Sequence, residues 1–122
     1  MEKPRDLAER TFRFAAATIG LVQQLPRVTT ADVLGKQLLR AATSIGANYR
    51  EARKARSMPD FISKITIVEQ EADEAHYWLQ LLREARIVDE SVTRALIQEA
   101  DELTAIFTTA GKTAKLKLRK KL

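Results

Sequence analysis

Apolar residues recur along most of this chain with the period of an amphipathic α-helix. In residues 61–82 they occur at alternating intervals of four and three, and residues 34–55 repeat that spacing. Such spacing lines one face of a helix that packs in a bundle. The two predicted stripes are Leu34, Leu38, Ala41, Ile45, Asn48, Ala52 and Ala55, and Phe61, Ile65, Val68, Ala72, Ala75, Leu79 and Leu82.

Two further segments have the same character but less regular patterns. Residues 92–110 carry one loose stripe, whereas residues 5–25 carry two. The fourth-segment stripe is Val92, Leu96, Leu103, Ile106 and Ala110, and the first-segment stripes are Leu7, Phe14, Leu21 and Leu25, then Ala8, Phe12, Ala15, Ile19 and Val22. A helix of a monomeric bundle needs one apolar face, so the surplus favours an interface between copies of the chain. A wide stripe buried within a monomer is the alternative.

Caps and prolines set the predicted helix boundaries. The helices are expected over about residues 5–25, 30–56, 58–87 and 90 to at least 110. The boundary residues are Pro26, Thr29 or Thr30, Ser57 with Pro59, and Asp89 or Ser91. Since all connections are short, the chain predicts an all-α, antiparallel up-down-up-down four-helix bundle. The bundle domain covers residues 1–111, and residues 112–122 form a basic C-terminal tail or helix extension.

Charge is segregated along the 122 residues behind a net charge of +5. Residues 31–57 contain six basic and two acidic residues, residues 58–110 four basic and eleven acidic, and residues 112–122 six basic and no acidic residue. This polarity suits head-to-tail self-association, or salt-sensitive binding of a polyanion such as RNA or DNA. The candidate phosphate-binding residues are Arg40, Arg50, Arg53, Lys54, Arg56, Lys112, Lys115, Lys117, Arg119, Lys120 and Lys121. A solvated basic face with a frayed tail is the alternative.

Residue types suited to catalysis are sparse. His76 is the single histidine, so Asp73-x-x-His76 lacks the second such motif that a di-iron bundle needs. No glycine-rich phosphate loop occurs, and Gly46 within a predicted helix indicates close approach of a neighbouring helix. We therefore expect no enzyme, no metal and no cofactor. Three polar residues at helical spacing predict a buried structural network rather than a ligand site: Ser44, Asn48 and Glu51.

The chain contains no cysteine, no signal-like apolar run and no stretch long enough to span a bilayer. These features predict a cytoplasmic protein that does not act in a membrane.

Residues 38–82 contain a more specific pattern, spread over two predicted helices. It comprises Arg40-Ala41, Ser44-Ile45, Ala47-Asn48, Glu51-Ala52, Ser57, Asp60-Phe61, Lys64, Glu71-Ala72 and Tyr77-Trp78-Leu79. In this pattern the chain resembles the bacterial four-helix-bundle family of 23S rRNA intervening-sequence proteins, also labelled S23 ribosomal proteins.

The resemblance implies a ring-like homopentamer without catalytic residues. Among the relatives, accessory proteins of diversity-generating retroelements form basic barrels that bind nucleic acid and a reverse transcriptase, and others are encoded within insertions in ribosomal RNA genes. The expected function is a non-enzymatic homo-oligomeric scaffold that binds nucleic acid electrostatically. The alternative is a protein-only adaptor that does not bind nucleic acid.

Overall fold

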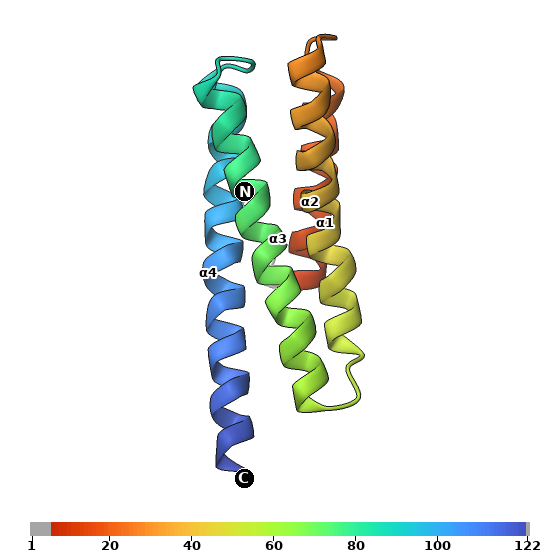
Figure 1. The fold of residues 1–122 in the computed structure, drawn as a ribbon, viewed down its shortest axis with the longest axis vertical. Coiled ribbons are helices and arrows are strands. Elements are labelled where there is room, and N and C mark those ends of the chain that lie inside the picture. Colours follow the sequence, from red (N-terminus) through yellow and green to blue (C-terminus); the bar gives the residue numbers. More distant parts are fainter. Residues whose placement is uncertain (1–5, 122) are drawn as a thin grey trace.

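Four α-helices account for most of the chain in the computed structural model, which describes residues 6–121. They are α1 (Leu7–Gln23), α2 (Thr29–Arg53), α3 (Met58–Glu84) and α4 (Glu90–Lys120). Figure 1 shows that successive helices run in opposite directions, with α1 against α2 and α3 between α2 and α4. The described residues form no strand, and the predicted all-α four-helix fold is confirmed. Residues 1–5 of the predicted bundle domain, which include the predicted start of the first helix, and residue 122 of the predicted tail lie outside the described residues.

Two of the predicted caps are present. The Ser57 side chain accepts a hydrogen bond from the backbone N–H of Asp60 at 3.2 Å, and Pro59 lies in the first turn of α3. The Asp89 carboxylate accepts from the backbone N–H of Ser91 at 3.1 Å. Each side chain satisfies a backbone donor that has no partner within its helix.

Other boundaries differ from the prediction. Thr29 is already helical, and the residue before it, Val28, caps α2 without a side-chain hydrogen bond. Helices α2 and α3 end at Arg53 and Glu84, each three residues earlier than expected. In contrast, α4 continues without a break through the basic segment to Lys120. Residues 112–120 are therefore an extension of α4.

The core lies where the stripes of α2 and α3 face each other. Ile65, Val68, Ala72, Ala75, Leu79 and Leu82 of α3 are buried, as are Leu38, Ala41, Ile45 and Ala52 of α2. The first stripe of α1 packs against this core through Phe14 and Leu21. On the same face of α1, Thr11 and Thr18 are fully buried, and their hydroxyls donate to the carbonyls of Leu7 and Phe14. Main-chain carbonyls thus satisfy these two buried polar groups.

The predicted stripe of α4 was wrong in part. Val92 is exposed, whereas the adjacent Thr93 is buried, and Phe107 lies in the core in place of the half-buried Ile106. The residues that α4 buries are Thr93, Ala100, Leu103, Phe107, Gly111 and Ala114. The buried Thr93 hydroxyl donates to the Glu90 carbonyl at 3.2 Å. Thr93 and Gly111 were missed because a threonine and a glycine do not look like core positions in an apolar pattern.

Helix α1 is much shorter than α4. It has 17 residues against 31, so it spans about 26 Å against about 46 Å. Its first turns are located by two contacts: Thr11 lies beside Gly46 of α2, and Arg10 pairs with Glu99 and Glu102 of α4. Beyond that level the bundle consists of α2, α3 and α4 alone, in the lower part of Figure 1. We call this region, residues 50–66 and 107–121, the open end.

None of the helices in the described part of the chain is both long enough and apolar enough to cross a membrane.

Candidate nucleic-acid interface

The open end gathers basic residues that lie far apart in the sequence. Its two segments contain eleven Lys or Arg residues and only two acidic residues, Glu51 and Asp60. Asp60 pairs with Lys64 at 3.1 Å. Within residues 6–121, none of the other ten basic side chains forms an ion pair, and all ten are exposed. The fold therefore concentrates a net positive charge where the end of α2 meets the end of α4.

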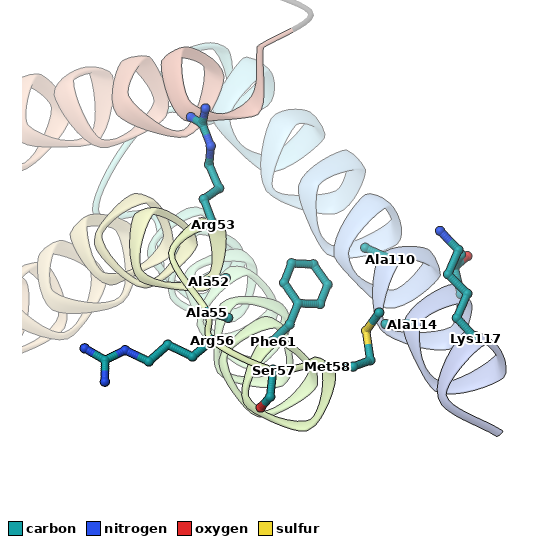
Figure 2. A pocket seen from close by; sticks show the side chains of 11 residues that line it. Ala52, Arg53, Ala55, Arg56, Ser57, Met58, Phe61, Ala110, Ala114 and Lys117 are labelled. Carbon is teal, nitrogen blue, oxygen red and sulfur yellow. The ribbon is translucent and has the colours of Figure 1, made fainter. Parts of the chain in front are cut away.

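A cleft of about 590 Å³ lies within the open end. Its floor is apolar, formed by Ala52, Ala55, Met58, Phe61, Ala110 and Ala114, and its rim carries Arg53, Arg56, Ser57, Thr113 and Lys117. Figure 2 shows the Phe61 ring between the end of α2 and α4, with the two arginines on one side and Lys117 on the other. An apolar floor and a cationic rim thus occur in one site.

Aromatic packing supports the α2 side of this cleft. The Tyr49 and Phe107 rings lie 5.5 Å apart between α2 and α4, tilted by 53°. The Arg53 guanidinium lies 6.0 Å from the centroid of the Tyr49 ring, within the range of a cation–π interaction. Arg53 is therefore positioned by a ring that is itself held against the core, while its charge stays exposed.

Of the eleven predicted phosphate-binding residues, only Arg53, Arg56 and Lys117 line the cleft. Arg40 lies 13 residues before Arg53 in α2, or about 20 Å along the helix. It pairs with Glu71 at 2.9 Å and with Glu74 of α3. Arg50 is exposed and stands at the boundary of the open end, where it lines an apolar surface between α1 and α2. The others, Lys54, Lys112, Lys115, Arg119, Lys120 and Lys121, are exposed around the open end without lining the cleft.

The Arg40 pairing fixes the charge state of Glu74. The hydrogen bond from Arg40 lowers the pKa of the Glu74 carboxyl, and a second from Trp78 Nε1 at 3.1 Å acts in the same direction. The same interaction with Glu74 raises the pKa of Arg40. Both groups therefore stay ionised and compensate each other, which weakens Arg40 as a phosphate ligand.

The predicted buried network of Ser44, Asn48 and Glu51 was wrong. Ser44 and Asn48 are half-buried, and each donates to a carbonyl of its own helix, Arg40 and Ser44 respectively. Glu51 is exposed. Residues three and four apart share a helix face, but the main-chain carbonyl one turn earlier is a nearer acceptor than another side chain.

The second stripe of α1 forms an apolar surface with α2. Phe12 is 71% exposed and Ile19 is 40% exposed. Together with Ala15, Ala16 and Ala47 they line a shallow, mostly apolar depression of about 310 Å³. The surplus of apolar side chains predicted for α1 is thus present on the surface of a single chain.

The cleft residues Met58, Phe61 and Thr113 were not among the predicted site residues. Phe61 was assigned to the core stripe because it continues the spacing of α3. It is the first member of that stripe, however, and it lies at the level that α1 does not reach. The feature of the sequence that could have indicated a binding role for Phe61 is its closeness to the basic residue Arg56.

Comparison with known proteins identifies a family and a solved structure to which this chain is similar. The family model described as 23S rRNA-intervening sequence protein matches residues 5–109. The crystal structure of a protein of unknown function from the S23 ribosomal protein family of Bacteroides thetaiotaomicron is 33% identical in sequence. It superimposes with a TM-score of 0.81, and the match covers 88% of this chain and 99% of that one. Among curated proteins, none matches.

Proposed function

Because the chain belongs to the 23S rRNA-intervening sequence protein family, we propose that it is a non-enzymatic, homo-oligomeric helical scaffold that binds nucleic acid electrostatically. The binding surface is the open end, where the C-terminal parts of α2 and α4 meet. A protein of this kind works in the cytoplasm, where RNA and DNA are accessible.

One observation supports nucleic-acid binding above the others. Ten exposed basic side chains without carboxylate partners among residues 6–121 surround a single end of the bundle. Keeping so many like charges close together opposes folding, and the negative charges of a bound polyanion would relieve this repulsion. Release of the polyanion's condensed counterions would favour binding further. Six of the ten lie beyond residue 109, where the family match ends. The α4 extension therefore strengthens binding in this chain beyond what the matched region supplies.

The apolar surface of α1 and α2 supports self-association. Phe12 and Ile19 expose a large apolar area that a second copy of the chain would remove from water. We propose the pentamer that the family resemblance implies. Light scattering on a gel-filtration peak tests assembly: Phe12→Glu should dissociate it, whereas Val92→Glu, also at an exposed apolar position, should not. A strictly monomeric wild-type protein at micromolar concentration would refute the oligomer.

Nucleic-acid binding is tested by a salt series with two charge-matched triple variants. Changing Arg53, Lys54 and Arg56 to Gln removes three cations from the open end. The control changes Arg27, Lys36 and Arg94 to Gln, which removes three exposed cations at the opposite end of the bundle.

The expected readout is the slope of log K against log salt for a short DNA duplex. Each lost phosphate contact lowers the magnitude of the slope by about 0.9, so the open-end variant should lose about 2–3 and the control almost nothing. Equal losses in both variants would reject the open end as the binding surface. No binding by the wild type at low salt would reject nucleic-acid binding altogether.

The second candidate function is a protein-only adaptor, and the exposed apolar surface around Phe12 favours it. In that case the protein forms oligomers, or binds a protein through this surface, and shows no affinity for nucleic acid at any salt concentration.

A further inference from the structure

The cleft at the open end combines two chemistries that a continuous duplex does not use together. A duplex presents phosphates outward and keeps its base faces stacked inside, so it can engage the rim of the cleft but not its floor. The floor consists of apolar side chains around the Phe61 ring. If only the rim bound phosphate, the apolar floor would stay in water, and its burial would add nothing to the free energy of binding.

An unpaired nucleotide fits both parts of the cleft. Its base has a flat face that stacks on an aromatic ring, and its edge carries polar groups for hydroxyls such as those of Ser57 and Thr113. The phosphates on either side of the base would reach cations of both helices, since Arg53 and Arg56 lie on the α2 side of Phe61 and Lys117 on its α4 side. The volume of about 590 Å³ lies within the range of pockets that hold small organic ligands.

We propose that this cleft receives an unpaired nucleobase, so that the protein prefers nucleic acid containing single-stranded nucleotides over an uninterrupted duplex. The inference rests on the proposed nucleic-acid function and adds the recognised feature to it. Arginine suits the rim because its planar guanidinium binds phosphate through two hydrogen bonds and also stacks on bases. The structure thereby gives Phe61 a binding role in addition to its packing role.

An acidic amphipathic helix from another protein is the competing occupant, because it would lie where α1 falls short. Its carboxylates would suit the rim cations. A helix, however, presents a continuous apolar stripe along its length. The cleft instead has one aromatic ring in its floor, with cations on its α2 side and on its α4 side. That arrangement suits a flat base between two phosphates better than a helix.

The experiment compares two duplex DNAs that are identical except for a two-nucleotide bulge in one of them. Both affinities are measured by fluorescence anisotropy at one salt concentration, so that the electrostatic attraction to the shared duplex contributes equally to each. Two variants alter the cleft without changing charge. Ala110→Leu fills it from α4, and Phe61→Leu keeps an apolar side chain while removing the aromatic face. Ala95→Leu, at an exposed position near the other end of α4, is the matched control.

The wild type and Ala95→Leu should bind the bulged duplex about 5- to 150-fold more tightly than the continuous one, the range expected for stacking of one base. Ala110→Leu and Phe61→Leu should bind both duplexes equally, at the affinity of the wild type for the continuous duplex. Circular dichroism verifies that each variant is folded.

Other outcomes separate the two proposals. Salt-dependent binding of both duplexes with equal affinity by the wild type would overturn the nucleobase cleft and leave the electrostatic function standing. Binding of neither duplex would overturn both. Equal binding of the duplexes, together with a Glu-rich amphipathic peptide that binds the wild type but not Ala110→Leu, would assign the cleft to a protein helix.

Discussion

Replacing Gly46 by alanine tests the close approach of α1 and α2. A Cβ at this position would lie 3.2 Å from Thr11 Oγ1, closer than most natural Cβ contacts, and 3.5 Å from Thr11 Cβ, an ordinary contact distance. Thr11 is fully buried, and its hydroxyl is held by the Leu7 carbonyl at 2.7 Å. The threonine therefore cannot move away unless α1 moves with it.

The expected magnitude is the difference between two opposing effects. Alanine is favoured over glycine in a helix interior by about 1 kcal/mol. Overpacking a well-packed site costs about 1–3 kcal/mol. Gly46→Ala should therefore destabilise the protein by about 1 kcal/mol, which lowers Tm by about 3–5 °C for a chain of this size. Gly20→Ala is the matched control, because a Cβ there meets nothing within 4 Å, and it should stabilise by about 1 kcal/mol.

Urea unfolding followed by circular dichroism at 222 nm measures both variants. Protein concentration is held constant because self-association stabilises the folded state by mass action. Adding Thr11→Ala should remove much of the Gly46→Ala penalty, a non-additivity expected of residues in contact. If Gly46→Ala stabilised the protein as much as Gly20→Ala, the close helix approach at Thr11 would be refuted.

Two further predictions concern ion pairs. Arg10→Met should destabilise the protein by about 2 kcal/mol in urea unfolding, because the Arg10 and Glu99 side chains are only 12% and 14% exposed and form two hydrogen bonds of 2.7 and 2.8 Å. The control, Arg13→Met, breaks an exposed pair with Glu9 and should cost under about 0.5 kcal/mol. Equal losses of stability in the two variants would contradict the structural role of Arg10. Glu74 has a lowered pKa in the folded protein, so its contribution to stability is complete above the ordinary glutamate pKa and is lost as the pH falls through the folded value. Stability curves from pH 7 downward should therefore show a smaller acid loss for Glu74→Gln than for the wild type, and superimposable losses would show that the Arg40 interaction does not stabilise the fold.

The basic residues show what a local pattern can and cannot locate. Arg53, Arg56 and Lys117 were identified from charge alone, and the structure brings all three to one cleft. Arg40 was grouped with them because it lies in the same basic segment as Arg53 and Arg56, yet its partners Glu71 and Glu74 come from α3. No sequence pattern could reveal that pairing, since it depends on which faces of α2 and α3 meet.

The sequence by itself determined the helices of this protein and most of its core. Apolar spacing and the caps at Ser57 and Asp89 act within a few residues, so their effect does not depend on the rest of the chain. Tertiary structure decided which residues α4 buries and where the shorter α1 leaves the open end uncovered. It also placed Phe61 between cations on its α2 side and on its α4 side. These features follow from how helices of unequal length align against each other, and that alignment is set by contacts between residues far apart in the chain.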